Sequence, residues 1–189
     1  MHEQEEKKIL MQAGGSKQKG ATFERDVCKR LSLWASNGLR EDLYWRSSMS
    51  GGRATIQIRQ GIQNKSQAGD ISSIDRQGSE LVNRFCIECK HYGNLDLISG
   101  IIKNKGVLYS FWNKLTRDAN AIGKLPFLLA KQNHLPSLVL VTPAGALTLN
   151  LKKNIAIATL YRWNAILYNG DDFLRSDYPF GEAHAARPT

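Results

Sequence analysis

The residues best suited to chemistry lie between Asp70 and Lys90 of this 189-residue chain. In the segment 85–90, apolar and polar side chains alternate, which is typical of a strand and places Glu88 and Lys90 side by side on one face. Residues 76–79 are polar and include a glycine, so we expect a turn that folds the segments before and after it into a β-hairpin. Such a hairpin would bring the Asp70 carboxylate near Glu88.

Two carboxylates on rigid strands can bind Mg²⁺, which prefers hard oxygen ligands and keeps several waters. The main-chain carbonyl of Cys89 offers a further oxygen ligand. A lysine beside such a metal, here Lys90, can stabilise the negative charge that develops on a phosphate. We therefore interpret Asp70, Glu88 and Lys90 as a metal-dependent site for cleaving phosphodiester bonds. The alternative is that Glu88 and Lys90 belong to an ordinary solvated strand face, because short patterns of this kind also arise by chance.

A further carboxylate, Glu24, lies in a helix predicted over residues 19–36, where apolar residues recur at helical spacing. Glu24 shares one side of this helix with Cys28 and Leu31. An unpaired charge within an apolar stripe is costly, so Glu24 needs a metal, a lysine or an arginine as its partner. In the simpler alternative, Glu24 lies at the edge of the stripe and pairs with a surface basic residue.

The overall charge indicates an anionic partner, because the chain carries a formal net charge of +9 and its pI is about 9.6. Nucleic acid is the leading candidate, and we expect no membrane association, since no apolar run is long enough to span a bilayer. Three cysteines argue against a disulfide framework and favour a reducing, cytoplasmic location. The pair Cys86 and Cys89 would lie on opposite strand faces, and the chain has no second ligand pair, so we do not expect zinc.

Later segments complete the predicted domain. A helix is expected over residues 107–121, a buried strand over 127–131 and a second over 138–142, with further short strands near the C-terminus. The length fits a single domain, which we place at residues 17–176. We expect residues 1–16 to form a flexible arm and residues 177–189 a disordered tail.

Four segments in this order resemble the PD-(D/E)xK nuclease superfamily, and most of all the archaeal-type Holliday-junction resolvases and their phage relatives. The resemblance covers roughly residues 17–131 and rests on these segments: Lys19-Gly20-Ala21-Thr22-Phe23-Glu24-Arg25, Arg46-Ser47-Ser48-Met49-Ser50-Gly51-Gly52, Gly69-Asp70 and Ile87-Glu88-Cys89-Lys90. It implies an α/β fold with a mixed sheet. The core would be restriction-endonuclease-like, with helix, three strands, helix and strand, followed here by extra C-terminal strands.

The resemblance also implies roles for individual residues. Asp70 and Glu88 would bind the metal, Lys90 would be the catalytic lysine, and Glu24 would bind a second metal or a metal-bound water. Mg²⁺ is the expected cofactor, with Mn²⁺ as a substitute, and the products would carry a 5′-phosphate. Ser50 would be the serine of a loop that contacts DNA. The full set of expected DNA-binding residues is Arg46, Ser47, Ser48, Ser50, Arg53, Lys114, Arg117 and Lys131.

The expected substrate is branched DNA, in particular a four-way junction. Symmetric cutting of such a junction takes two active sites, so a homodimer is implied. Two alternatives remain: a restriction or repair nuclease that acts on linear duplex, and a basic DNA-binding protein that no longer catalyses. The chain departs from the resolvase pattern in two places. Residues 53–68 are longer than the usual link, and Gly69 stands where the motif has proline.

Overall fold

The computed structural model describes residues 2–47 and 69–180, with side chains from residue 18 onward. The expected DNA-binding residues Ser48, Ser50 and Arg53 lie outside the described residues. The elements, in chain order, are α1 (His2–Ala35), β1 (Tyr44–Arg46), β2 (Ile71–Ser73), α3 (Arg76–Arg84), β3 (Phe85–Tyr92), α4 (Leu97–Lys103), α5 (Val107–Ala121), β4 (Leu125–Gln132), β5 (Ser137–Val141), α6 (Pro143–Thr148), the 3₁₀ turn Lys153–Ile155, β6 (Ala156–Leu160), the 3₁₀ turn Tyr161–Trp163, β7 (Ala165–Asn169) and α7 (Gly170–Leu174).

A five-stranded mixed sheet forms the centre of the described structure, with strand order β3-β4-β5-β7-β6. Strands β3 and β4 are parallel, and the remaining neighbours are antiparallel. A parallel pair needs a crossover connection, which α4 and α5 supply here. This architecture confirms the predicted α/β class with additional C-terminal strands, and it is consistent with a restriction-endonuclease-like core.

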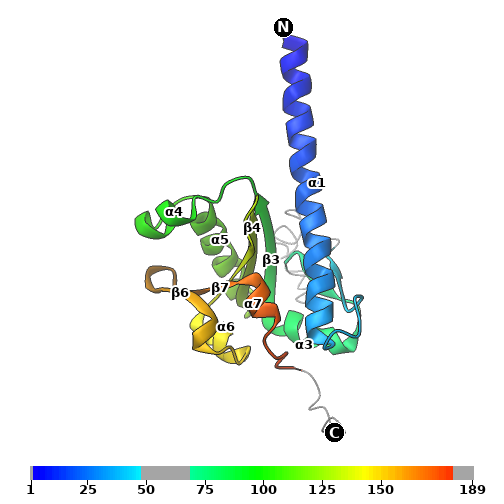
Figure 1. Cartoon of the computed structure of the whole chain (residues 1–189), viewed down its shortest axis with the longest axis vertical. Helices are drawn as coiled ribbons and strands as arrows, with labels where there is room; N and C mark the ends of the chain where they lie inside the picture. The colour runs from blue at the N-terminus through cyan, green and yellow to red at the C-terminus, as the bar shows by residue number, and fades with distance from the viewer. Residues whose placement is uncertain (1, 48–68, 181–189) are drawn as a thin grey trace.

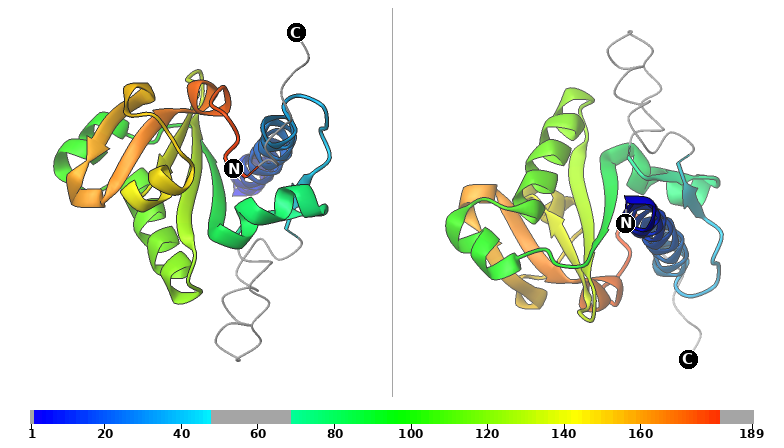
Figure 2. Two further views of the ribbon diagram at one scale, coloured as in Figure 1. Left: turned by 90° about the horizontal axis from the view of Figure 1, so that it is seen from below. Right: turned by 90° about the horizontal axis from the view of Figure 1, so that it is seen from above.

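Helices cover both faces of the sheet, with α1 and α3 on one side and α5 on the other (Figure 2). Alternation along β3 explains how one strand serves both layers. Its residues Phe85, Ile87 and Cys89 join the core under α1, whereas Cys86 joins the core under α5. The predicted division of this strand into two faces is therefore confirmed.

The predicted β-hairpin is wrong. Residues 76–84 form helix α3, which begins because the Asp75 side chain accepts a hydrogen bond from the Gln77 N–H at 2.9 Å. The helix is held in place by Leu81 and Val82, which are buried in the core. Strand β2 consequently pairs with β1 in an antiparallel two-stranded sheet rather than with β3.

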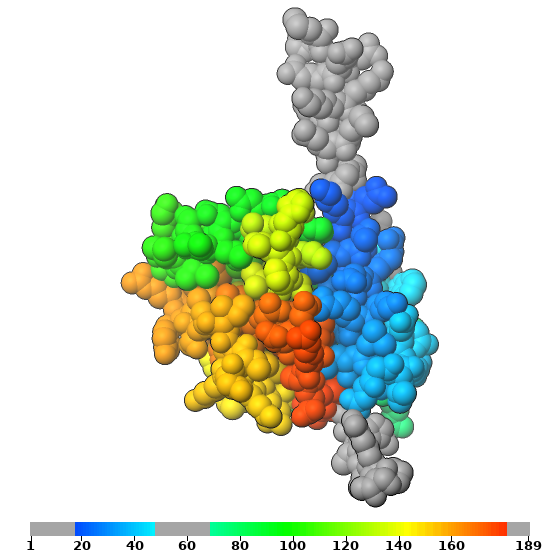
Figure 3. Space-filling view, in the orientation of Figure 1, coloured from blue at the N-terminus to red at the C-terminus, as the bar shows by residue number. Residues whose placement is uncertain are grey.

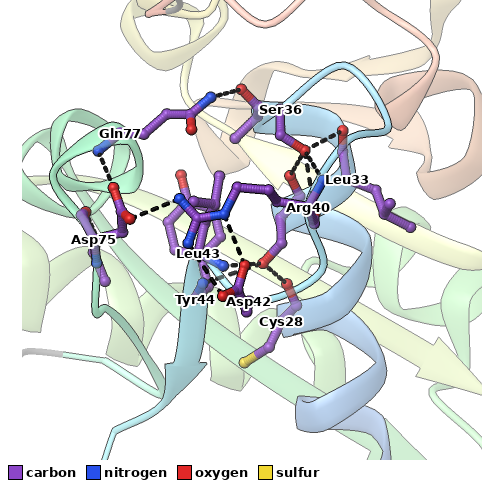
Figure 4. A network of polar contacts seen from close by, with 12 residues as sticks. Cys28, Leu33, Ser36, Arg40, Asp42, Leu43, Tyr44, Asp75 and Gln77 are labelled. Carbon is purple, nitrogen blue, oxygen red and sulfur yellow. Dashed lines mark hydrogen bonds and ion pairs between the residues drawn. The ribbon is translucent and has the colours of Figure 1, made fainter.

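A polar network fixes α1, β1 and α3 relative to one another (Figure 4). Arg40, in the link after α1, donates to Asp42 and reaches Asp75, the residue that caps α3, at 2.7 Å. On α1, the Ser32 hydroxyl accepts hydrogen bonds from the main-chain N–H groups of Leu43, at the end of the link, and Tyr44, at the start of β1. These contacts set the direction in which β1 leaves α1, and β1 carries Arg46 to the site described below.

The two ends of the chain differ from expectation. Helix α1 begins at His2 rather than at residue 19, and its N-terminal half extends beyond the sheet (Figure 1). The segment after α7 returns to the end of α1, as the contact between the blue and red surfaces in Figure 3 shows. There Tyr178 packs on Trp34 with ring centroids 4.8 Å apart. The first residues of the segment predicted to be a disordered tail therefore pack against the core, and residues 181–189 lie outside the described residues.

Candidate active site

Strand β3 positions the two charged residues predicted from the alternating pattern. Glu88 and Lys90 extend from the strand's C-terminal half, toward the side covered by α5, and their side chains are 22% and 26% exposed. The buried residues Ile87 and Cys89 anchor the same stretch from the opposite face. Because a packed strand holds the two polar side chains, they are fixed in position yet remain reachable from solvent.

Asp70 reaches Glu88 through a parallel bridge rather than through a hairpin. Gly69 pairs with Ile87, and the Asp70 N–H donates to the Ile87 carbonyl at 2.7 Å. The Asp70 carboxylate in turn accepts the Cys89 N–H at 2.8 Å. Asp70, which is itself buried, therefore lies at the edge of β3 beside Glu88, as the sequence led us to expect, although the connecting structure is different.

Gly69 is required at this point by the backbone geometry. Its φ of +99° is one that residues with side chains rarely adopt, and a Cβ atom here would lie 2.5 Å from the Ile87 carbonyl oxygen. Proline, which fixes φ near −65°, could not take this conformation. The glycine that replaces the motif's proline is thus the residue that allows Asp70 to approach β3.

The Lys90 ammonium lies among the oxygens that were predicted to bind a metal. Its Nζ contacts Glu88 Oε1, is 3.6 Å from Asp70 Oδ2 and donates to the Cys89 carbonyl at 3.3 Å. The Phe111 ring of α5 lies 5.8 Å from the same nitrogen, within cation–π range. One positive charge is therefore already accommodated by the three predicted ligand oxygens.

Burial raises the pKa of the Asp70 carboxyl above its ordinary value, and the Lys90 charge offsets only part of this shift. The pKa of Glu88 is also raised, first by burial and then by the negative charge of Asp70. For Lys90 burial alone would lower the pKa, but the two carboxylates outweigh it and raise the pKa. Two part-buried carboxyls, one of which raises the proton affinity of the other, form a site that favours a cation.

Glu24 has an arginine partner. Its carboxylate forms an ion pair with Arg46 of β1, which agrees with the expectation that a charge in the apolar stripe needs a partner. The negative charge of Glu24 is close enough to contribute to the raised pKa of Asp70. Arg46 was expected to contact DNA, and here it links Glu24 to the strand that precedes Asp70.

The donor set fits a hard divalent cation. Among the described residues, no three His, Cys, Asp or Glu side chains converge as a metal-binding group. The site instead offers two carboxylates and one carbonyl, and Mg²⁺ is commonly held by one or two carboxylates with waters completing its shell. Zinc and calcium sites normally use more protein ligands than this.

The other expected DNA-binding residues are spread around the site. Ser47 is buried, and its N–H donates to the Asp70 carbonyl at 2.8 Å, so its main chain helps to position Asp70. Lys114 pairs with Asp118 at 2.7 Å and is close enough to Glu88 for their charges to interact. Arg117 is exposed on α5, and Lys131 lies at the end of β4 beside His91.

Sequence reasoning missed two contacts of this site. It predicted a helix over residues 107–121 but did not connect Phe111 of that helix with Lys90, because this contact depends on how α5 packs against the end of β3. It also did not recognise Arg46 as the partner of Glu24. No local pattern could have indicated either contact, because both depend on how distant elements pack.

Comparison with known families decides the assignment. Residues 15–171 match the model of the family described as "Phage putative PDDEXK endonuclease". The chain belongs to this family. It is therefore an endonuclease of the PD-(D/E)xK type, a phosphodiester hydrolase that acts on DNA, and members of the superfamily are generally metal-dependent. No curated protein and no solved structure matches the chain. Among the described residues, no helix is both long and apolar enough to cross a membrane.

Proposed function

We propose that this protein is a Mg²⁺-dependent endodeoxyribonuclease that cuts branched DNA and acts as a homodimeric Holliday-junction resolvase. The observation that carries the catalytic part is the convergence of three oxygens on the Lys90 ammonium. They come from Asp70, Glu88 and the Cys89 carbonyl, which are the ligands that the motif predicts.

Each residue then has a distinct task. A bound Mg²⁺ would polarise the scissile phosphate and make a bound water more acidic. Asp70 and Glu88 would hold the metal, and the Lys90 ammonium would donate to the phosphate and stabilise its developing charge. Glu24, which is ion-paired with Arg46, would orient a water molecule or support a second metal.

Branched DNA is favoured by the resemblance to resolvases and by the distribution of basic residues. Lys114 and Arg117 lie on α5, on one side of β3, whereas Lys131 lines the opposite side. Cations on both sides of the catalytic strand suit a substrate whose strands diverge at the site. A dimer supplies the two centres that symmetric cutting requires.

The first test compares a labelled four-way junction with a linear duplex of the same sequence, each with and without Mg²⁺. Symmetric, Mg²⁺-dependent nicks in the junction alone are expected. Equal cutting of both substrates would instead identify a restriction or repair type of nuclease. Tight binding with no cutting in either Mg²⁺ or Mn²⁺ would indicate that the protein binds DNA but does not catalyse its cleavage.

The second test replaces the site residues. Glu88→Ala and Lys90→Ala should each lower the cleavage rate at least about 100-fold, a loss typical of removing one group that stabilises a transition state, while leaving DNA affinity similar. Glu80→Ala, which removes an exposed carboxylate of α3, is the matched control and should cleave at the wild-type rate. Cleavage at the wild-type rate by either site variant would show that the site is wrongly assigned.

A further inference from the structure

A cavity near the catalytic strand lies beside the carboxylates and does not include them. It has a volume of about 560 Å³ and opens between α1 and the C-terminal ends of β3 and β4. This volume falls within the range of small-molecule binding sites, roughly 300–1,000 Å³. The catalytic group itself forms an open edge, so the cavity needs a separate explanation.

One wall of the cavity is a face of α1. Its lining residues recur one helical turn apart, so they form a continuous surface. They are Gln18, Lys19, Thr22, Phe23 and Asp26. This wall combines an aromatic ring with an amide, a hydroxyl, a carboxylate and an ammonium group, which together can hydrogen-bond to a polar ring edge.

The opposite wall comes from the sheet. His91 and Lys131 are in register on the parallel strands β3 and β4, so they project on the same side, toward α1. The His91 ring packs against the Phe23 ring with centroids 5.7 Å apart, and its Nε2 is 3.0 Å from Asn133 Oδ1. The partly exposed His91 ring, supported by the buried Phe23 ring, and a flanking lysine thus line the inner part of the cavity.

Both walls adjoin the catalytic residues in sequence. Phe23 precedes Glu24 on α1, and His91 follows Lys90 on β3. The Cα atoms of Lys90 and His91 are about 3.8 Å apart, while their side chains point to opposite sides of the strand. The link to the catalytic group is made through α1, because Glu24 is close enough to Asp70 for their charges to interact and the cavity wall lies on the same helix. A nucleotide next to the scissile phosphate can therefore reach the cavity.

We infer that this cavity binds a single unpaired nucleotide next to the scissile phosphate. Its base would lie against the His91 ring, which the buried Phe23 ring supports, and Asp26 would accept a hydrogen bond from an exocyclic amine. Lys19 and Lys131 would contact the nucleotide's phosphate. Stacking on aromatic side chains is the usual way in which proteins hold an unpaired base. The inference rests on the proposed nuclease function and specifies the substrate as DNA with an unpaired nucleotide at the cut.

The test measures binding in EDTA, without cleavage, for three probes: free dAMP, a linear duplex, and the same duplex with one bulged nucleotide. Wild type should bind the bulged duplex about fivefold or more tightly than the plain duplex, as expected if one stacked base contributes about 1 kcal/mol or more. Thr22→Trp, which fills the cavity from an exposed helix position, should remove this preference and the binding of dAMP.

Two charge variants complete the design. Lys131→Met should weaken binding of the bulged duplex more than that of the plain duplex. Lys153→Met, which removes an exposed lysine near the opposite edge of the sheet, should leave the preference unchanged. The inference would be overturned by two results together. Lys131→Met would lower the affinity for both duplexes equally, which would make Lys131 an ordinary phosphate contact, and Thr22→Trp would still prefer the bulged duplex.

The result also separates the two proposals. Cleavage of junctions by a protein that shows no preference for the bulged duplex and does not bind dAMP would overturn the nucleotide pocket and leave the nuclease function standing. A preference that Thr22→Trp removes, in a protein that cleaves no DNA, would support the pocket and contradict the catalytic proposal.

Discussion

At the scale of single residues, Asp70 determines how the site responds to pH. Its pKa is raised by burial, so the folded state retains the Asp70 proton to a higher pH than the unfolded chain does. The stability that this provides is present below the ordinary carboxyl pKa and is lost as the pH rises through the raised pKa. In the absence of metal, the Asp70 carboxyl therefore contributes less to stability at neutral pH than it does at acidic pH.

Replacing Asp70 with asparagine tests this argument. As the pH rises from about 4 to 7.5 in EDTA, the free energy of unfolding of wild type should fall relative to that of Asp70→Asn, measured by urea denaturation. Removing the Asp70 charge also removes one cause of the raised pKa of Glu88, which adds to the effect. The control is Asp96→Asn. Asp96 is exposed, and its backbone has a left-handed conformation that asparagine also tolerates. A pH-independent difference between wild type and Asp70→Asn would contradict the argument.

At the scale of elements, the approach of β2 to β3 depends on Gly69. Gly69→Ala introduces a Cβ atom into the Ile87 backbone at a strained φ, so the free energy of unfolding should fall by about 1–3 kcal/mol. The strain also displaces Asp70, so cleavage should fall more steeply than stability. Gly20→Ala is the matched control, because a Cβ there meets nothing within 4 Å, and alanine favours the helix by about 0.5–1 kcal/mol. Chemical denaturation and single-turnover cleavage measure both effects, and equal behaviour of the two variants would refute the role of Gly69.

The elements also explain which features the sequence could predict. The alternation along β3 placed Glu88 and Lys90 correctly, because Phe85, Ile87 and Cys89 must share the face that packs under α1, which leaves Glu88 and Lys90 on the other face. Helix α3 was missed because its first turn, 76–79, contains residues that also suit a hairpin, and its Leu81 and Val82 face a core that only the tertiary fold creates. The parallel bridge at Gly69 and the ion pair between Glu24 and Arg46 join segments that no local pattern relates.

At the scale of the whole molecule, the segment after α7 joins the end of α1 to strand β1. Trp34 of α1 donates from Nε1 to the Ser176 carbonyl at 2.7 Å, and its ring packs on Tyr178. The Tyr178 hydroxyl is 3.1 Å from the hydroxyl of Tyr44, which is 1% exposed. This contact connects the last described segment with the strand that leads to Arg46 and the site.

The Tyr44–Tyr178 pair provides a test of this connection. Burial raises the pKa of both phenols, so both hydroxyls stay protonated at neutral pH. Tyr178→Phe leaves the buried Tyr44 hydroxyl without this partner and should lower the free energy of unfolding by about 1–3 kcal/mol. The double variant with Tyr44→Phe removes both polar groups, so it should be more stable than the sum of the two single changes predicts. Urea denaturation of the four proteins measures this coupling; strictly additive losses would mean that the two hydroxyls do not depend on each other.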